Sequence, residues 1–568
     1  AQGRTEQALT HSDSALRIVE SLRSKVGNPQ LRTTYFSSKR PFYELHVDLL
    51  MNGVVGDGAS GSPAAALEAS ERARARSLVD LLRETGIAIR EGVDPALLQR
   101  EESLRQRINV VESSRVRALT GKPDPQQLAA IERELDGLFR DYQQLQADIR
   151  VRSPQYAAIS QAEAFRIDEI QQALDPDTVL LEYLLGDERS YVWAVSSSSV
   201  AGYSLPSRAA IEDLVRDVYP RIARETTATQ PAGRSRTEDA RRATSQLSRV
   251  LLGPIASHLG QKRLVVVADG ALLYVPFTLL DSPASPESPG RPLLLDHEVV
   301  HLPSMSSLLT MRRTRKPGQV AAASVGIIAD PVFTLDDSRV ATRQARGEVV
   351  RDSLPARDLA RSAADDARAS ARGVVRFPRL RFTRQEAAGI AALVPSDRRF
   401  QALDFAASRQ TASSDPFARQ TILHFATHGL INSTHPELSG LVLSLVDSRG
   451  QPQDGFLRLH DIYNLKLDAA LVVLSACQTA LGKDIRGEGL IGLTRGFMYA
   501  GAPRVVASLW AVEDRATAEL MKRFYEGMLT RGLTPAAALR DAQLALRRDR
   551  RWSDPYYWGA FVLQGEWR

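Results

Sequence analysis

The sequence predicts an α/β protein in which a sheet covered by helices follows an all-helical region. Up to Ser153-Pro154, leucine and isoleucine recur at helical spacing among charged residues. Beyond that point, short runs rich in Val, Ile and aromatic residues alternate with helical stretches, and such alternation builds a sheet with helices on its faces. The 568 residues exceed what one hydrophobic core usually supports, so we expect more than one domain.

Charge and cysteine content restrict the class of protein. The 73 basic and 67 acidic residues leave a net charge of +6 spread along the chain, which favours protein partners over direct nucleic-acid binding. A single cysteine excludes an intramolecular disulfide and is typical of a reducing compartment, so we expect a cytoplasmic protein. No apolar run is long enough to predict a membrane span. The chain starts at Ala1 instead of a methionine, and we expect a segment to precede it.

The helical region is predicted in two parts. Residues 1–90 predict two or three antiparallel helix pairs, because the segment 66–86 places apolar residues at helical steps and stops at Gly86. These helices resemble degenerate tetratricopeptide repeats, although no 34-residue period is readable, and an ordinary helical bundle is the alternative. Residues 91–153 predict a long helical hairpin, with the turn TGKPDP between its helices, that serves as a spacer.

Residues 154–315 and 376–568 predict two halves of the α/β part. The first half contains the strand-like runs TVLLEYLL, SYVWAVS, RLVVVADG and EVVHLPS. The second contains TILHFATHG, LVLSLVD, ALVVLSACQ, RVVASLW and YWGAFVLQG, with a helix predicted from Leu490 to Met498. Residues 316–375 predict a partly disordered linker or insertion, since most of them are Arg, Asp, Ala and Ser, and a regulatory linker that is cleaved after arginine is the alternative.

The single cysteine and one histidine stand where predicted strands end. The apolar run of TILHFATHG ends at His428, and that of ALVVLSACQ ends at Cys477. Reactive groups gather at the carboxyl ends of strands in open α/β sheets, so adjacent strands would bring these two side chains together. A neighbouring imidazole can accept the proton of a thiol and then protonate a leaving amine. The amide of Gly429 could donate to the oxyanion.

Two other interpretations of these residues stay open. Free cysteine is among the most buried residue types, so Cys477 taken alone fits a core position, although its polar neighbours fit a core poorly. A zinc site is the second interpretation, with the ligands His424, His428, His435 and Cys477. The zinc interpretation is weakened because the first two histidines lie on a predicted strand instead of a helix, and because no second cysteine is present.

Six segments of the second half carry a resemblance to a known family. They are, in order, ILHFATHG, HPELSGLVLS, DGFLRLHDIYNLKL, LVVLSACQTALG, RGEGLIGLTRGFMYAGAPRVVASLWAVEDRATAELMKRFY and PYYWGAFVLQG. Together they resemble the signature segments of the CHAT domain, a caspase-like peptidase module that commonly follows tetratricopeptide repeats and belongs to the clan of caspases and separase. The resemblance covers roughly residues 165–568. It implies a caspase-like three-layer module with a non-catalytic and a catalytic half, preceded by helical repeats.

The resemblance also implies a site and a reaction. The histidine of the family's HFATHG motif falls on His428, and the cysteine of its LSAC motif falls on Cys477. The implied activity is that of a cysteine endopeptidase, in which the Cys477 thiolate attacks a peptide carbonyl and His428 is the general acid and base. No metal or other cofactor is implied. Bacterial origin and a role in regulated proteolysis follow from the resemblance alone.

Three acidic residues are predicted to bind substrate. In separases, an acidic residue after an LW strand receives a P1 arginine, and the similar stretch SLWAVEDRAT offers Glu513 and Asp514. We favour Asp514, because a carboxylate there could pair bidentately with a guanidinium; the alternative is that it caps a helix beginning near Ala516. Glu488 lines the cleft or fixes its loop.

Two functions follow from these features. The preferred hypothesis is a cysteine endopeptidase that cleaves protein substrates after a basic residue, regulated by a protein that binds the N-terminal helical repeats. The alternative is a catalytically silent scaffold in which the repeats bind a partner. A thiol far beyond hydrogen-bond reach of the imidazole would favour the scaffold.

Overall fold

The computed structural model describes most of the helical region and of the α/β part. The described residues are 5–23, 29–52, 54–55, 59–60, 62–74, 78–79, 82, 94–120, 124–152, 165–223, 234–283, 290–314, 323–340, 377–430, 432, 436–476, 482–485 and 489–568. Cys477, Glu488 and His435 lie outside them, as does most of the predicted linker 316–375. The described part of that linker contains a strand of the central sheet, over Val325–Pro331.

The N-terminal region is helical. Its elements are α1 (Thr5–Arg23), α2 (Pro29–Asn52), β1 (Val54–Val55), β2 (Ala59–Ser60), α3 (Pro63–Ala73), α5 (Pro95–Thr120) and α6 (Pro125–Arg152). Helix α3 begins where its sequence predicts, because the Ser62 side chain accepts a hydrogen bond from the Ala65 amide and Pro63 at the first position has no amide to satisfy. Helices α5 and α6 pair with each other through buried leucine, isoleucine and phenylalanine side chains.

An 11-stranded mixed sheet forms the centre of the molecule. Its strands, in spatial order, are β5 (Val200–Leu205), β4 (Ser190–Val195), β3 (Thr178–Leu184), β6 (Arg263–Val267), β7 (Val299–His301), β18 (Phe561–Gly565), β17 (Arg504–Ser508), β14 (Leu471–Ser475), β10 (Ile422–Ala426), β8 (Val325–Pro331) and β9 (Arg399–Asp404). Strand β18, the last in the sequence, pairs antiparallel with β17 and parallel with β7. It thereby joins strands from two parts of the chain into one sheet.

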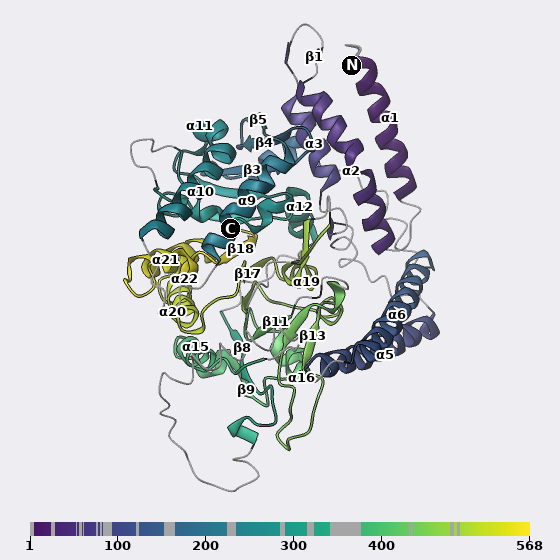
Figure 1. Ribbon diagram of the computed structural model, residues 1–568, viewed down its shortest axis with the longest axis vertical. Helices are drawn as coiled ribbons and strands as arrows, with labels where there is room; N and C mark the ends of the chain where they lie inside the picture. Colours follow the sequence, from purple (N-terminus) through teal and green to yellow (C-terminus); the bar gives the residue numbers. More distant parts are fainter. Residues whose placement is uncertain are drawn as a thin grey trace.

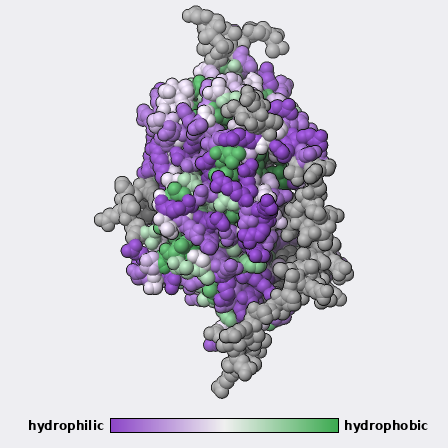
Figure 2. Space-filling view, turned by 90° about the vertical axis from the view of Figure 1, so that its left-hand side faces the viewer, coloured by the Kyte–Doolittle hydropathy of each residue, from purple (hydrophilic) through white to green (hydrophobic). Residues whose placement is uncertain are grey.

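Helices cover the sheet. They are α8 (Ile167–Ala173), α9 (Arg208–Ile222), α10 (Arg234–Leu252), α11 (Ala256–Leu259), α12 (Met305–Thr314), α15 (Phe382–Ala391), α16 (Arg409–Ala412), α17 (Asp415–Ala418), α18 (Leu459–Ile462), α19 (Leu493–Tyr499), α20 (Asp514–Tyr525), α21 (Pro535–Arg548) and α22 (Pro555–Trp558). Strands β3, β10 and β14 are buried along their whole length, as expected for strands between helical layers. On the side of the molecule that Figure 2 shows, hydrophilic residues predominate, and hydrophobic residues form separate small groups.

Two small sheets accompany the central one. Strands β11 (His428–Leu430), β12 (Gly440–Val442) and β13 (Phe456–Arg458) form an antiparallel sheet, and β15 (Gly482–Ile485) pairs with β16 (Gly489–Gly492). The helix predicted from Leu490 to Met498 therefore starts later, at Leu493, because residues 489–492 pair as a strand. The α/β class and the preceding helical region are as predicted (Figure 1).

Buried ion pairs hold the N-terminal helices on the sheet. Asp269, two residues beyond β6, accepts hydrogen bonds from Arg40 of α2 and, over 2.7 Å, from the amide of Leu185. Arg74, at the end of α3, donates to the carbonyl oxygen of Ala268 over 2.8 Å. The helical region and the sheet thus share a buried polar interface.

Within the described ranges, no helix is both long and apolar enough to cross a membrane.

Candidate active site

Strands β10 and β14 are parallel neighbours in the central sheet. Their register pairs Ala426 of β10 with Ser475 of β14. His428 lies two residues beyond Ala426, and Cys477 lies two residues beyond Ser475 in the sequence. The two strands are therefore adjacent, as predicted, and both lead toward the same edge of the sheet, while Cys477 itself is outside the described residues.

A backbone carbonyl and two aromatic rings surround the imidazole of His428. Its Nε2 lies 2.6 Å from the carbonyl oxygen of Pro378. Because a carbonyl oxygen only accepts hydrogen bonds, Nε2 carries the proton and Nδ1 is the basic nitrogen of the neutral ring. The ring centroids of Phe333 and Phe377 lie 5.1 Å and 5.8 Å from that of His428. These contacts fix both the orientation and the tautomer of the imidazole.

The backbone around His428 is tied to the small antiparallel sheet. His428 pairs with Val442, and Gly429, the predicted oxyanion donor, pairs with Leu441. The hydroxyl of Thr427, the residue before His428, donates to the carbonyl oxygen of Val442. The histidine therefore sits at the junction between the end of β10 and the start of β11.

Glu513 caps the helix that follows β17. Its carboxylate accepts hydrogen bonds from the amides of Arg515, over 3.1 Å, and Ala516, over 2.6 Å, so it satisfies the first turn of α20. The alternative interpretation, in which Asp514 caps this helix, is therefore wrong, because Asp514 is the first residue inside the helix and the residue before it provides the cap.

Asp514 turns toward helix α15 instead. Its Oδ2 accepts a hydrogen bond from the amide of Phe382 over 2.8 Å, at the start of α15. Phe382 is four residues beyond Pro378, whose carbonyl holds His428, so Asp514 borders the segment that contacts the histidine. Burial, followed by the charges of Glu386, Glu513 and Asp330, outweighs that hydrogen bond and raises the pKa of Asp514 to about 7.

Comparison with known proteins assigns the module. The family model of the CHAT domain matches residues 241–566, which is more than half of the chain. The chain belongs to the CHAT domain family. Tetratricopeptide repeat protein 28 of Mus musculus is 37% identical over 105 residues, and its human counterpart is 36% identical over 113 residues. These alignments cover 18% and 20% of this chain but only 4% of either relative.

Solved structures resemble this CHAT domain protein more remotely. Separase in the Saccharomyces cerevisiae separase–securin complex has a TM-score of 0.41 and 10% sequence identity, covering 94% of this chain and 43% of the separase chain. Porphyromonas gingivalis RgpB, in the complex of its pro- and mature domains, has a TM-score of 0.34 and 10% identity, covering 63% of this chain and 76% of RgpB.

Another histidine of the CHAT domain, on the strand that leads to His428, has other partners. His424 of β10 is fully buried, and its Nδ1 lies 3.1 Å from the hydroxyl of Tyr525 in α20. Its Nε2 lies 3.0 Å from Oε1 of Glu386 in α15. Burial, and then the charge of Glu386, raises the pKa of Tyr525 above its usual range. His424 thus links the sheet to two covering helices, and among the described residues no group of acidic or histidine side chains is arranged as a metal site.

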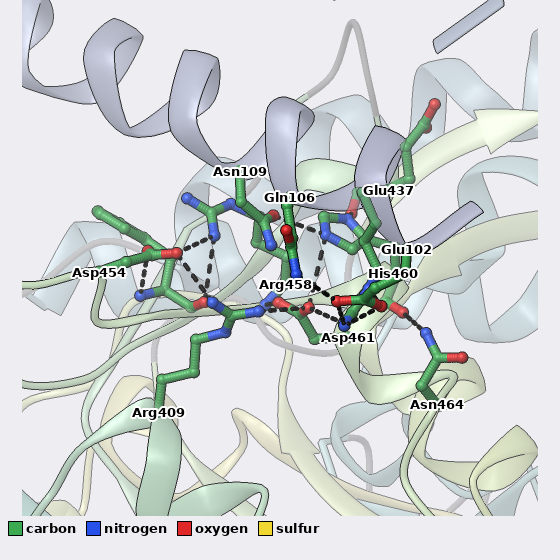
Figure 3. A network of polar contacts seen from close by, with 12 residues as sticks. Glu102, Gln106, Asn109, Arg409, Glu437, Asp454, Arg458, His460, Asp461 and Asn464 are labelled. Carbon is green, nitrogen blue, oxygen red and sulfur yellow. Dashed lines mark hydrogen bonds and ion pairs between the residues drawn. The ribbon is translucent and has the colours of Figure 1, made fainter. Parts of the chain in front are cut away.

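The hairpin α5–α6 contacts the CHAT domain through a polar network (Figure 3). The Asn109 side chain lies 2.9 Å from Nε2 of His460, and Arg105 Nη1 lies 3.2 Å from Asp461 Oδ1. Arg458, the last residue of β13, donates to the hydroxyl of Ser113 over 3.2 Å. Since β13 pairs with β12 and β12 pairs with β11, the hairpin contacts the small sheet whose first residue is His428.

Sequence reasoning missed the residues around His428 that precede it in the chain. Pro378 contributes only a backbone carbonyl, which no sequence pattern marks. Asp330, directly before the end of β8, binds Arg379. The rule that polar groups at the carboxyl ends of strands gather at one edge could have identified Asp330, because it stands near the end of the apolar run SVGIIADP.

Proposed function

We propose that this CHAT domain protein is a cysteine endopeptidase of the caspase- and separase-like clan, with Cys477 as nucleophile and His428 as general acid and base. The observation that carries the proposal is the hydrogen bond from His428 Nε2 to the Pro378 carbonyl, at the end of a strand whose parallel neighbour leads to Cys477. That bond makes Nδ1 the basic nitrogen, which is the protonation state a general base needs.

The reaction follows from that tautomer. Nδ1 of His428 takes the proton of the Cys477 thiol, and the resulting thiolate attacks the carbonyl carbon of the scissile peptide. The amide of Gly429 donates to the oxyanion that forms. The imidazolium then returns its proton to the leaving amine as the C–N bond breaks, which leaves a thioester on Cys477. A water that is deprotonated by His428 hydrolyses the thioester and restores the thiol.

Asp514 is the group that we propose for recognition of a basic P1 residue. The wild type is expected to cleave a randomised peptide library after arginine or lysine, and Cys477→Ala is expected not to cleave it. Since the pKa of Asp514 is about 7, the preference for a basic over a neutral P1 residue should increase between pH 6 and pH 8, as the carboxylate ionises. Asp514→Asn is expected to lower kcat/KM for substrates with a basic P1 residue roughly 30-fold, which corresponds to a loss of about 2 kcal/mol of transition-state stabilisation.

The adjacent acid provides the matched control for that experiment. Glu513→Gln keeps an oxygen that can cap α20 and is expected to keep the P1 preference. Because the charge of Glu513 helps to raise the pKa of Asp514, the pH dependence in this variant should move to lower pH. Mass spectrometry of the cleavage products compares the four proteins directly. A cleavage pattern in Asp514→Asn that matches the wild type at every pH would rule out Asp514 as the P1 group. Glu488, which lies outside the described residues, stays a candidate substrate-binding residue, with fixing its own loop as the alternative, and Glu488→Gln in the same library tests it.

Regulation through the helical region is the second part of the proposal. Its support is the polar network that joins α5 to α18 and β13, next to the sheet that begins at His428 (Figure 3). Large apolar side chains are also 45–60% exposed on α1 and α2, as expected of a protein-binding surface. They are Ile18, Leu22, Phe42 and Leu45. We infer a cytoplasmic protein whose helices bind a regulatory protein; a scaffold without catalysis is the function that remains if no cleavage occurs.

Acid is expected to weaken the docking of α5. Burial, ahead of the opposing charge of Asp461, lowers the pKa of His460 from 6.5 to about 4. Between pH 6.5 and pH 4, His460 binds more protons when α5 is detached than when it is docked. The docked state therefore has its full stability above pH 6.5. Its stability falls as the pH is lowered, by on the order of 2 kcal/mol at pH 5. Hydrogen exchange of residues 95–120, relative to intrinsic rates, should therefore accelerate from pH 7 to pH 5.

His460→Gln is the variant that isolates this effect, because glutamine keeps a polar partner for Asn109 and does not titrate. Its exchange in α5 should change little across the same pH range. If the wild type and His460→Gln accelerate equally, the acid effect comes from other groups and His460 does not control docking.

A further inference from the structure

The strand next to β10 ends in an irregularity at Asp330, whose carboxylate binds the residue after Pro378. Between Ala329 and Pro331 the pairing of β8 with β9 shifts its register, so Asp330 is an extra residue. Its backbone φ is +48°, in the left-handed region that residues other than glycine seldom adopt. Bulges of this kind redirect a side chain beside functional sites. The direction of the Asp330 carboxylate is therefore built into the end of β8.

That carboxylate is buried and bound by arginines. Asp330 is 1% exposed, and it accepts two parallel hydrogen bonds from Arg379, from Nε to Oδ1 over 2.9 Å and from Nη2 to Oδ2 over 2.8 Å. Arg384 donates to Oδ2 over 2.7 Å, and Arg339 Nη1 lies 3.1 Å from Oδ1. A buried carboxylate needs such partners, and the two-bond pair with Arg379 fixes both position and orientation of the guanidinium.

Arg379 is covalently next to the group that holds the catalytic imidazole. Pro378 lies between Arg379 and Phe377, and its carbonyl accepts the hydrogen bond from His428 Nε2. On the other side, the Phe377 ring lies 6.2 Å from the Phe456 ring, in a buried apolar cluster. The carbonyl is therefore anchored on both sides, by aromatic packing before it and by the bond to Asp330 after it.

We propose that Asp330 and Arg379 are positioning residues for His428, a proposal that rests on the peptidase function above. They hold the Pro378 carbonyl where it keeps the proton on Nε2, so that Nδ1 is the basic nitrogen of the ring. If the anchor is removed, the carbonyl loses its fixed place, and the ring can exchange tautomers or rotate. The thiol then loses its proton acceptor part of the time, although no group that touches substrate has changed.

The single cysteine of the chain makes this testable without a substrate. The rate at which iodoacetamide alkylates Cys477, followed by intact mass over pH 5 to 10, reports the pH at which the thiolate forms. The proteins compared are the wild type, His428→Ala, Asp330→Asn, Arg379→Gln and Asp404→Asn. Asp404 is the matched control because it binds Arg339 and Arg384 but not Arg379, so it belongs to the same arginine cluster without contacting the anchor of Pro378.

The expected results separate this proposal from the proposed function. In the wild type, the midpoint pH of the alkylation rate should lie below the ordinary thiol pKa of about 8.5. In His428→Ala, this midpoint should return to that value. Asp330→Asn and Arg379→Gln should move the midpoint at least about one pH unit toward His428→Ala, and should lower kcat about tenfold with KM nearly unchanged. Asp404→Asn should match the wild type.

Three outcomes would overturn the proposal. If the wild type and His428→Ala share one midpoint, the peptidase function itself fails, and the positioning role fails with it. If His428→Ala differs from the wild type while Arg379→Gln and Asp330→Asn do not, only the positioning role fails. If Asp404→Asn shifts as far as the other two, the cluster acts through general stability. Should Asp330→Asn not fold, Arg379→Gln decides, because it leaves Asp330 paired with Arg384 and Arg339.

Discussion

Replacing His428 with alanine is expected to lower kcat for peptide cleavage by about 10²- to 10⁴-fold, the usual contribution of a general acid and base. The reason is the tautomer fixed by Pro378, which makes His428 a ready acceptor for the thiol proton. Cys477→Ala should abolish cleavage, because no other cysteine is present in the chain. The measurement is the rate of cleavage of one peptide selected from the library.

The control for this effect is a histidine outside the site. His11 of α1 is exposed on the surface of the N-terminal helices, so His11→Ala should cleave at the wild-type rate. Cleavage by His428→Ala within about threefold of the wild type would remove His428 from the mechanism. Such a result would direct attention to another base near the end of β14.

Replacing Asp269 with alanine is expected to lower the free energy of unfolding by about 3 to 5 kcal/mol, the cost of leaving buried arginines without their carboxylate. Asp269 is 3% exposed and binds Arg40 of α2. Although burial alone would raise its pKa, the charges of Arg40, Arg74 and Arg208 hold the pKa of Asp269 below the usual range. Urea unfolding at pH 7, followed by circular dichroism, measures the difference.

The pH dependence gives this prediction a second check. A carboxylate with a depressed folded pKa contributes stability above its unfolded value of 3.8, and that stability is lost as the pH falls further. The stabilities of the wild type and Asp269→Ala should therefore begin to converge below pH 4 and approach each other only as the pH falls toward the depressed folded pKa. The surface pair of Asp213 with Arg216 is 71% exposed on both sides, so Asp213→Ala should change stability little. Equal effects of the two substitutions would show that α2 is not held by a buried ion pair.

Local sequence patterns were sufficient for the strands that position the site. The runs that end at His428 and before Cys477 are uninterrupted apolar segments, which is why they are buried parallel strands between helical layers. The rule on carboxyl ends of strands predicts only that both runs end at one edge of the sheet, and the register of β10 with β14 adds that the two strands are neighbours. The apolar runs in the sequence therefore predict the two strands that lead to His428 and Cys477.

Contacts that depend on tertiary folding could not be predicted. The Pro378 carbonyl is a backbone group that lies 50 residues from His428 in the chain, and the partners Asn109 and His460 are 351 residues apart. Glu513 caps α20 and Asp514 contacts α15. These roles would change places if the helix started one residue later. Sequence periodicity does not determine a helix start that finely, so it could not decide whether Asp514 caps the helix.

Labelling with a peptide that carries a cysteine-reactive group is the most direct test of the central claim. The wild type is incubated with a peptidyl acyloxymethyl ketone that has arginine at P1, and mass spectrometry locates the adduct. One adduct is expected, on Cys477, that forms much more slowly in His428→Ala and is absent from Cys477→Ala. Labelling of Cys477 at equal rates in the wild type and in His428→Ala would contradict that claim, because the thiol would then react without help from the imidazole.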